Sequence, residues 1–413
     1  MKSADEKKRI LLLTQWFDPE PTFKGLVFAR ELVHQGFEVE VLTGFPNYPS
    51  GRVYPGYKIK LIQREIIDGV SITRVPLYPN HDQSAIKRVL NYASFAASTL
   101  FYGLFGAKRP DVIYAYHPPL TVGISASLIK LFRRVPVVYD IQDMWPDTLR
   151  ATGMLSNTKL LSVVSRVCDW VYRQVSHIVV LSPGFKKLLV DRGVPDSKID
   201  VIYNWADEAA LRTPNGAAPE ILCAGDKFRI LFAGNMGKAQ ALETVLEAAL
   251  ILQQRKARVD FIMLGGGVEV ENLKQRSKDL ELTNVVFLPP VPMSEVGSYL
   301  HAADALLVHL RQDPLFEITI PSKTQAYMAA GKPLLMAVNG DAADLVVHAR
   351  CGVFAESENA FALANAAEEL SQLDKLEFEQ LASNAKDYYD ENLALQVGVR
   401  KFAKIFHFVA IKK

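Results

Sequence analysis

Short apolar runs alternate with longer helix-like stretches in the first half of this 413-residue sequence, and the same alternation restarts in the second half. In the first half, the runs expected to form strands and helices are Ile10–Thr14, Gly25–Gln35, Glu38–Thr43, Asp111–Ala115, Leu120–Phe132, Val135–Asp140 and His177–Ser182. Such alternation is typical of βαβ units, whose parallel sheet is covered by helices on both faces. The sequence therefore predicts an α/β fold.

The second set of runs points to a second domain of the same kind. Its members are Arg229–Ala233, Ala239–Gln253, Asp260–Leu264, Asn284–Leu288, Ala305–Leu310 and Pro333–Val338. Residues 206–226, which include Thr213–Pro219, have the turn-rich composition of a linker. We expect two doubly wound, Rossmann-like domains, 1–205 and 206–385, that face a cleft lined by the carboxyl ends of their strands. A helical segment, 386–413, is expected to pack back toward the first domain.

Composition argues against several functional classes. A formal charge of +2 gives no reason to expect nucleic acid as a partner. The three cysteines, Cys168, Cys223 and Cys351, are far apart in apolar or small-residue surroundings, as in reduced core residues of a cytoplasmic protein. The apolar run after the charged segment Met1–Arg9 is too short for a signal peptide, so no export is expected.

Several motifs of metal and cofactor chemistry are missing. The sequence has no Asp-x-Asp triplet, no GxGxxG after the first strand, no P-loop, no HExxH-type histidine pair and no GxSxG elbow. This counts against a dinucleotide redox enzyme, a P-loop NTPase and a zinc site of the HExxH type. No metal ligands and no cofactor are expected.

One helical stretch is unusually apolar. Val89–Ala107 is a 19-residue uncharged segment with Lys87-Arg88 before it and Lys108-Arg109 after it. A membrane span needs about 20 apolar residues, and polar side chains dilute this stretch. Two interpretations stay open: a buried domain helix, or an interfacial helix lying on an anionic membrane with basic flanks.

The segment Phe316–Pro333 combines an acidic residue with a well-marked helix. Pro321 suits a first helical turn, and Gly331 suits the helix end. The free amides at such a helix start, with Lys323 in its first turn, suit a phosphate. Glu317, just upstream, can accept hydrogen bonds from sugar hydroxyls. The alternative is an ordinary helix–strand unit with an incidental glutamate.

Two glycine turns follow strands in the second half, Gly234–Lys238 and Gly265–Gly267. Glycines let backbone amides approach a diphosphate, and Lys238 adds positive charge. Each turn alone is equally consistent with a structural role. Together with Glu317 and Lys323, the turns predict a nucleotide site.

Three polar loops follow strands in the first half: Asp18–Gly25, Tyr116–Pro119 and Asp140–Asp147. All three are expected to line the cleft. There, His117 or Asp143 could act as an acid, a base or an orienting group on an acceptor hydroxyl. The alternatives are a capping or core histidine and an aspartate that caps a helix.

These features together resemble the family-four glycosyltransferases of the GT-B fold, over nearly the whole chain. The matching segments are Phe17–Gly25, Leu42–Pro49, Tyr116–Pro119, Asp143–Asp147, Tyr203–Trp205, Ala233–Gly237 and Glu317–Pro333. Within the family, Thr43–Gly56, Val75–Pro79 and Ala85–Phe95 are most similar to bacterial O-antigen and capsule enzymes that transfer N-acetyl-L-fucosamine.

The resemblance implies a retaining, metal-independent transfer. The donor would be a UDP-sugar bound mainly by the second half, and no cofactor besides this substrate is implied. The acceptor would be a polyprenyl-diphosphate-linked saccharide against the first half. The enzyme would act in O-antigen, lipopolysaccharide or capsule biosynthesis, in the cytoplasm and peripherally on the inner face of the cytoplasmic membrane.

Site residues carry over from the resemblance position by position. The expected catalytic residues are His117, Asp143 and Glu317. The expected donor-binding residues are Gly25, Gly234, Asn235, Gly237, Lys238, Gly265, Gly266, Ser322, Lys323 and Gln325. The expected acceptor-side residues are Glu20, Lys24 and Trp145.

Three positions depart from the family pattern. Many relatives have a glutamate where Ala326 stands, an arginine at Asn235 and a lysine at Gln240. The usual ribose contact and diphosphate charges are therefore missing, and we expect Lys238 and Lys323 to supply the charge. Two other classes stay open: a sugar-nucleotide epimerase or hydrolase of the same fold, and a catalytically degenerate partner subunit.

Overall fold

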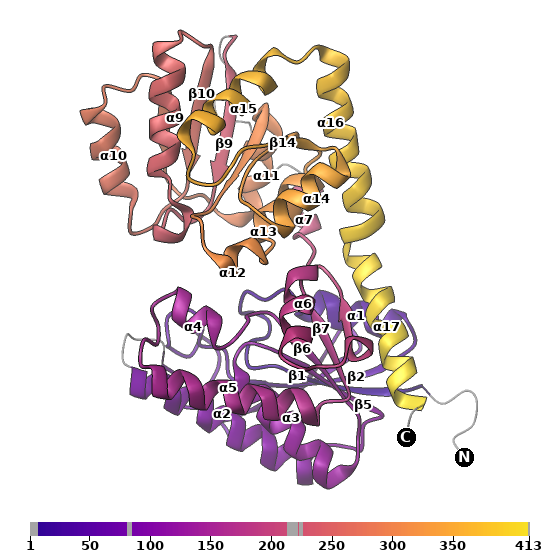
Figure 1. The fold of residues 1–413 in the computed structure, drawn as a ribbon. Coiled ribbons are helices and arrows are strands. Elements are labelled where there is room, and N and C mark those ends of the chain that lie inside the picture. The colour runs from indigo at the N-terminus through magenta and orange to yellow at the C-terminus, as the bar shows by residue number, and fades with distance from the viewer. Residues whose placement is uncertain (1–6, 81–84, 213–221, 223–225, 412–413) are drawn as a thin grey trace. The chain divides into compact units, whose positions relative to one another are not determined.

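The computed structural model describes residues 7–80, 85–212, 222 and 226–411. The chain divides into two compact units (Figure 1). The N-terminal unit comprises residues 1–203 and 398–413, and the C-terminal unit comprises residues 204–397. Cys223 and the expected linker residues Thr213–Pro219 lie outside the described residues.

An eight-stranded sheet forms the centre of the N-terminal unit. Its strands, in spatial order, are β3 (Gln63–Ile67), β4 (Val70–Val75), β2 (Glu38–Gly44), β1 (Arg9–Leu13), β5 (Val112–Tyr116), β6 (Val137–Ile141), β7 (His177–Val180) and β8 (Ile199–Val201). Every pair is parallel except β3 with β4. Strands β5, β6 and β7 are buried along their whole length, as parallel strands with both faces covered must be.

The antiparallel hairpin of β3 and β4 was not expected from the sequence. Its turn consists of Asp68 and Gly69, with φ of +50° and +79°. A turn with two positive φ values matches the twist of the strands, and Asp-Gly is the residue pair that favours it. The sequence therefore contained a signal for this hairpin.

Helices cover both faces of the N-terminal sheet. They are α1 (Leu26–His34), α2 (Ala85–Phe105), α3 (Leu120–Arg133), α4 (Asp147–Ala151), α5 (Thr158–Gln174), α6 (Pro183–Asp191), the 3₁₀ turn η1 (Asp196–Lys198) and the last part of α17 (Leu395–Ile411). Helices α2, α3 and α5 lie side by side along one face (Figure 1). The apolar stretch expected as a helix at 89–107 is α2.

The last helix, α17, completes the core of the N-terminal unit. Phe402 lies edge-on to Phe28 and to Tyr114, with ring centroids 5.3 Å apart in both pairs. Phe406 contacts Tyr114 at 5.4 Å and Phe37 at 6.1 Å. Edge-to-face aromatic pairs of this kind are favourable beyond the area they bury. The N-terminal core is therefore built from both ends of the chain.

The expected border between residues 385 and 386 falls inside a continuous helix, α16 (Lys375–Tyr388). A π-helical turn, η3 (Tyr389–Leu393), follows it. The residues that join the N-terminal unit begin at Gly398.

The C-terminal unit contains a parallel six-stranded sheet. Its strands, in spatial order, are β11 (Val285–Leu288), β10 (Val259–Leu264), β9 (Phe228–Ala233), β12 (Ala305–His309), β13 (Leu334–Ala337) and β14 (Gly352–Phe354). The helices are α7 (Glu208–Arg212), α9 (Glu243–Gln254), α10 (Val270–Asp279), α11 (Met293–Ala302), α12 (Pro314–Glu317), α13 (Ser322–Ala329), α14 (Asp341–Ala349), α15 (Ala360–Gln372) and α16. The predicted α/β class with two doubly wound domains is confirmed.

The first helix of the C-terminal unit starts later than expected. Instead of a helix from Ala239, a 3₁₀ turn, η2 (Lys238–Gln240), comes first, and α9 begins at Glu243. Ala241 between them has a left-handed φ of +44°, which an α-helix does not contain. The loop after β9 is therefore longer than the sequence pattern suggested.

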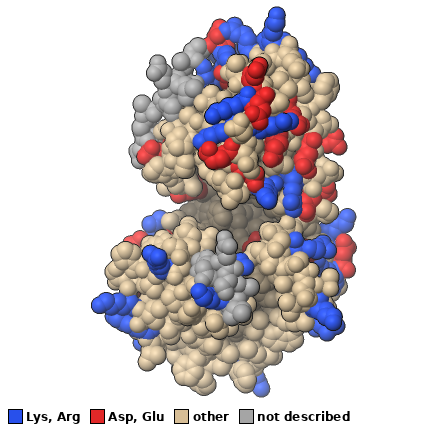
Figure 2. Space-filling model, turned by 90° about the vertical axis from the view of Figure 1, so that its left-hand side faces the viewer, with Lys and Arg blue, Asp and Glu red and all other residues tan. Residues whose placement is uncertain are grey.

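The two units differ strongly in charge. The N-terminal unit has 31 lysines and arginines against 18 acids, a net +13, whereas the C-terminal unit has 16 against 27, a net −11. On the face in Figure 2, the N-terminal unit (bottom) is largely neutral with scattered basic residues, and the C-terminal unit mixes both signs. The overall charge of +2 hides this division.

Candidate functional site

In the C-terminal unit, the two glycine turns that follow β9 and β10 pack backbone against backbone. The Met236 amide donates to the Gly266 carbonyl at 2.7 Å. A Cβ on Gly265 would lie 2.0 Å from the Gly234 carbonyl oxygen, and one on Gly267 would lie 2.3 Å from that of Met236. Because no side chain fits between the turns, packing alone explains why Gly265 and Gly267 are glycines.

The outer side of the first turn is open. Asn235 and Lys238 are exposed, and within the described ranges their amides have no hydrogen-bond partner. The Gly237 amide donates to the Gln240 side chain at 3.0 Å, which closes the turn. Unpaired amides beside a lysine are the groups that bind a phosphate.

Lys323, in the first turn of α13, reaches under this turn. Its Nζ is buried and lies 3.4 Å from the centroid of the Phe232 ring. A Cβ on Gly234 would lie 2.8 Å from the Lys323 Cε, so the lysine side chain packs against Gly234 where a larger residue would place its Cβ. Burial lowers the pKa of Lys323 to about 7. Ser322, which opens the helix, is exposed.

Glu317 ends the short helix α12, which Asp313 caps by accepting the Leu315 amide at 2.9 Å. Its side chain is half-buried, and no residue that the structure describes pairs with its carboxylate. Gly340, with φ of +77°, packs so closely that a Cβ there would lie 2.0 Å from the Glu317 carbonyl oxygen. Sequence reasoning missed Gly340, although an Asn-Gly pair after a strand signals a special backbone conformation.

Three further polar residues lie within this unit's core. Gln325 is 3% exposed and so does not present its amide to solvent. The Tyr327 hydroxyl accepts from the Ala233 amide at 2.9 Å and fixes the end of β9. His309 was not expected from the sequence to have a role. Its Nδ1 lies 2.6 Å from the Gln240 carbonyl oxygen. Burial lowers the pKa of His309 to about 4, so this ring is neutral and donates from Nδ1.

In the N-terminal unit, His117, Asp143 and Trp145 come together at the ends of β5 and β6. The Asp143 amide donates to the His117 Nδ1 at 3.4 Å, and the Trp145 ring is edge-on to the imidazole at 5.7 Å. His117 is 1% exposed, and this burial lowers its pKa to about 3. The imidazole is therefore neutral with its proton on Nε2, which makes it a hydrogen-bond donor. Burial also raises the pKa of Asp143.

Glu20, expected on the acceptor side, is an internal residue of the first loop. It is 2% exposed and accepts hydrogen bonds from the amides of Phe17 at 3.2 Å, Asn47 at 2.7 Å and Tyr48 at 2.7 Å. Burial raises the pKa of Glu20, and the three amides oppose this rise. The carboxylate ties two loops together and does not reach solvent.

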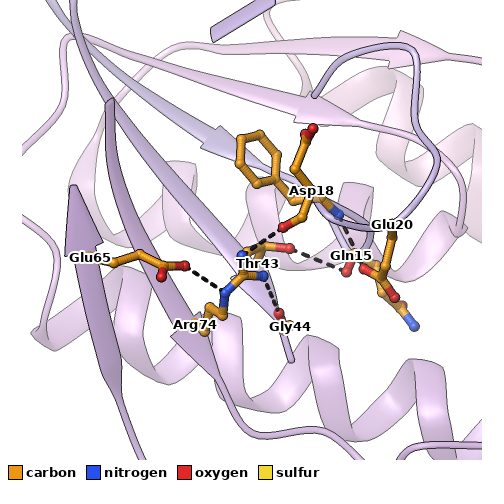
Figure 3. A network of polar contacts seen from close by, with 8 residues as sticks. Gln15, Asp18, Glu20, Thr43, Gly44, Glu65 and Arg74 are labelled. Atoms are coloured by element: carbon orange, nitrogen blue, oxygen red, sulfur yellow. Dashed lines mark hydrogen bonds and ion pairs between the residues drawn. The ribbon is translucent and has the colours of Figure 1, made fainter. Parts of the chain in front are cut away.

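Arg74 holds the same loop from the other side, and sequence reasoning did not identify it. Its guanidinium donates to the Asp18 carbonyl at 2.6 Å and to the Gly44 carbonyl at 3.2 Å, and it pairs with Glu65 at 2.8 Å (Figure 3). The side chain is 1% exposed. The planar fork of an arginine can satisfy three acceptors at once, which a lysine does not match.

Gly25 is required by a helix cap. The Asp18 carboxylate accepts from the Leu26 amide at 2.6 Å, at the start of α1. A Cβ on Gly25 would lie 2.2 Å from the same Asp18 oxygen. A carboxylate at a helix N-terminus is stabilised by the helix dipole. This contact accounts for the glycine without any ligand.

Lys24 was also expected to face the acceptor, but it is completely buried. Its Nζ lies 5.9 Å from the centroid of the Tyr116 ring and 5.6 Å from that of Phe402. Burial lowers the pKa of Lys24 to about 8, and the charge of Asp140 opposes this shift. The Asp140 carboxylate in turn accepts from the Tyr114 hydroxyl at 2.5 Å. Lys24 is therefore part of a polar core.

Two family models match the chain. A glycosyl transferase 4-like domain matches residues 26–205, and a glycosyl transferases group 1 domain matches residues 218–388. The chain belongs to the family-four glycosyltransferases. The predicted family is thus confirmed at this level.

Relatives of this glycosyltransferase include two bacterial proteins. The putative colanic acid biosynthesis glycosyl transferase WcaI of Escherichia coli is 27% identical over 337 residues, which cover 78% of this chain and 81% of that protein. The probable glycosyltransferase WbjE of Pseudomonas aeruginosa is 24% identical over 303 residues, 72% of this chain and 74% of that protein.

Solved structures agree on the fold. Sucrose-phosphate synthase of Thermosynechococcus elongatus superposes with a TM-score of 0.73 at 14% identity, covering 98% of this chain and 100% of that one. Anabaena HepE in complex with UDP-glucose gives 0.67 at 17% identity and covers 97% and 99%. The glycosyltransferase therefore has the GT-B fold.

Two absences can be stated for the described part of this glycosyltransferase. Those residues contain no group of three or more histidine, cysteine or acidic side chains placed to hold a metal ion. Among the same residues, no helix combines the length and the apolar character that crossing a membrane requires.

Proposed function

We propose that this glycosyltransferase moves a sugar from a UDP-sugar to a polyprenyl-diphosphate-linked saccharide, with retention and without a metal ion. The observation that carries the proposal is the set of unpaired polar groups at the strand ends of the C-terminal unit. In the described residues, neither the Glu317 carboxylate nor the Lys323 ammonium has a hydrogen-bond or ion-pair partner. A half-buried charged group without a partner is costly unless a ligand completes it.

The donor diphosphate would lie against the turn at residues 234–238 and the start of α13. The open amides of Asn235 and Lys238 and the two lysines offer donors to its oxygens. Glu317 would accept hydrogen bonds from donor-sugar hydroxyls. Solved HepE structures contain UDP and UDP-glucose, and that protein has the same fold.

In the transfer, the bond between the sugar and the diphosphate breaks, and the acceptor hydroxyl forms a bond on the same face of the sugar. The hydroxyl proton passes to the departing phosphate oxygen. Lys323 and Lys238 would stabilise the negative charge that develops there. His117, neutral with a proton on Nε2, would donate to a donor-sugar hydroxyl, and Asp143 would orient it through its amide.

A membrane-bound acceptor is supported by the outer face of α2. Beyond Lys87 near the helix start, its exposed residues follow a helical stripe without any charge: Val89, Leu90, Ala93, Ala97, Phe101 and Phe105. Phe101 is 69% and Phe105 75% exposed. The unit carries a net +13. An apolar stripe on a basic body suits the interface of an anionic phospholipid membrane, which we propose lies at the cytoplasmic side.

The names of the relatives support a role in surface polysaccharide synthesis. WcaI carries a name that refers to colanic acid, and we extend a polysaccharide role to this chain as part of the proposal. The resemblance of the Thr43–Gly56 region to fucosamine transferases makes N-acetyl-L-fucosamine our proposed donor sugar.

The test is turnover with a panel of UDP-sugars, with and without a short-chain lipid-diphosphate N-acetylglucosamine acceptor, in EDTA. We expect UDP release that needs the acceptor, survives EDTA and is fastest with UDP-N-acetyl-L-fucosamine. Release without any acceptor would replace the proposal with an epimerase or a hydrolase. UDP binding without release on any acceptor would replace it with a degenerate partner subunit.

A further inference from the structure

The Lys323 amino group has an unusual environment in the C-terminal unit. Its Nζ is buried beside the glycine turn, 3.4 Å from the centroid of the Phe232 ring, and its stem crosses Gly234. In the part of the chain that the structure describes, this nitrogen has no hydrogen-bond acceptor and no carboxylate partner. A lysine usually keeps its ammonium in water, so this placement needs an explanation.

Without a ligand, this position disfavours a charged amine. Burial removes the water that solvates an ammonium, and among the described residues only the face of Phe232 offers an electrostatic partner. Burial lowers the pKa of Lys323 to about 7. An amine in water titrates about three units higher. Near neutral pH, the empty site therefore contains a substantial fraction of uncharged lysine.

Among the described residues, no neighbouring side chain offers a negative charge to the Lys323 amino group. On α13 itself, the titratable neighbour is Tyr327, whose hydroxyl is bound to Ala233 and whose pKa is raised by burial. Strand β12 ends in His309, which is neutral above its pKa of about 4. The turn after β9 carries Lys238, which is exposed. Burial is the sole cause of the lowered Lys323 pKa.

We propose that Lys323 is uncharged in a large fraction of empty sites and takes up a proton when a nucleoside diphosphate binds at the glycine turn. The inference rests on the proposed function, because the anion is the diphosphate of the donor. Negative oxygens near Nζ give the ammonium the partners that the protein does not provide. The proton comes from solvent and returns to it when UDP leaves.

The direction of the pH effect follows from linkage. In the proposal, bound UDP raises the pKa of Lys323 above its value of about 7 in the free protein. At any pH between these two pKa values the bound state holds more protons than the free state, so binding weakens as pH rises above about 7. Within that window the affinity for UDP falls about tenfold per pH unit. Below pH 7 the lysine is already charged in the free protein, so Lys323 no longer contributes to the pH dependence of UDP binding.

Calorimetric titration with UDP measures the proton directly. Titrations at pH 8 in two buffers of different ionisation enthalpy give the number of protons taken up for each UDP bound. For a free-state pKa of about 7, we expect about 0.9 proton in the wild-type protein. The terminal phosphate of UDP is fully ionised at this pH and is the same in every variant, so differences between variants report the protein.

Two substitutions at the lysine and one matched control make the assignment specific. Lys323→Met retains the stem without a charge and should bind UDP with no extra proton and with an affinity independent of pH between about pH 7 and 9, where UDP is ionised. Lys323→Arg remains charged and should retain binding at pH 8 while losing the uptake. Lys238→Met removes the exposed lysine of the same turn and should weaken binding while leaving the uptake unchanged. Thermal unfolding of each variant reports whether it is folded.

The outcomes separate this inference from the proposed function. UDP binding with equal proton uptake in wild type and Lys323→Arg would overturn the inference and leave the donor site intact. Absence of UDP binding by the wild type up to millimolar concentrations would overturn both. An uptake that disappears with Lys323→Met or Lys323→Arg and persists in Lys238→Met supports the inference.

Discussion

The charged residues of the two candidate half-sites are used differently. In the C-terminal unit, Glu317 and Lys323 lack hydrogen-bond and ion-pair partners among the described residues. In the N-terminal unit, Glu20 accepts from three backbone amides of two loops, and Arg74 on β4 donates to two backbone carbonyls and pairs with Glu65. Ionisable side chains without such partners, like Glu317 and Lys323, are available to bind a polar or charged ligand of defined shape. Internally satisfied charges fix the loops that a ligand meets.

The same contrast extends to the outer surfaces. The N-terminal unit combines a net +13 with an uncharged apolar stripe on α2, whereas the C-terminal unit has a net −11. A basic, partly apolar body is attracted to anionic lipid, and an acidic body is repelled from it. We expect orientation at a membrane to be determined by the N-terminal unit.

The largest expected effect tests the unpaired carboxylate. Glu317→Gln should lower kcat/KM for the UDP-sugar about 100-fold to 1000-fold, because its charge would bind the sugar hydroxyls in the transition state. The melting temperature should stay unchanged, since no described residue depends on the carboxylate. Steady-state kinetics and thermal unfolding check this, with Glu271→Gln on the exposed side of α10 as the control. A lower melting temperature of Glu317→Gln with an unchanged kcat/KM would contradict the interpretation that the carboxylate serves a ligand and not the fold.

The matching change in the N-terminal unit should have the opposite signature. Glu20→Gln replaces an acceptor of three backbone hydrogen bonds by a group that cannot accept all of them. The free energy of unfolding should fall by about 3 kcal/mol. Urea unfolding measures this, and Glu38→Gln on the surface should cost less than about 1 kcal/mol. An unchanged stability with a raised acceptor KM would return Glu20 to the acceptor site.

A smaller effect distinguishes two glycines with positive φ. Gly340, at +77°, lies against the Glu317 backbone, whereas Gly36, at +91°, has open space around its Cα. Gly36→Ala should cost about 1 kcal/mol from backbone strain alone. Gly340→Ala should cost at least about 2 kcal/mol more and also lower kcat/KM, because Glu317 must move. Equal effects in both assays would show that the contact at Gly340 has no role in placing Glu317.

The smallest expected effect concerns the membrane. Phe105→Ser, on the apolar stripe of α2, should weaken co-sedimentation with vesicles containing phosphatidylglycerol about fivefold, which corresponds to about 1 kcal/mol. Phe361→Ser is the matched control, because Phe361 is 61% exposed on the acidic unit. Equal losses for both variants would remove the stripe from the proposed membrane surface.

The sequence pattern predicted the sheets better than the loops. Buried parallel strands such as β5 and β9 appear as apolar runs, because burial on both faces leaves no other residue type. The helix expected from Ala239 begins at Glu243, since the left-handed Ala241 leaves no mark on hydrophobic periodicity. The Asp68-Gly69 hairpin had a signal, which an analysis of βαβ alternation did not use.

For the candidate sites, residue type and position were predictable, but orientation was not. The proximity of His117, Asp143 and Trp145 follows from their place at neighbouring strand ends. The burial of Glu20 and Lys24 could not be predicted from their place in the sequence. It depends on Arg74, Phe402 and other residues distant in sequence. Long-range contacts of this kind require the three-dimensional fold.

The return of α17 to the N-terminal unit has a consequence for synthesis of the chain. Phe28 and Tyr114 complete their packing only against Phe402 and Phe406, which are made almost 300 residues after Tyr114. Translation at about 5 to 20 residues per second places tens of seconds between them. Throughout that interval the first unit lacks part of its core, and the C-terminal unit, which ends at Val397, has its full sequence before the first unit does. The order of folding is therefore expected to run against the order of synthesis.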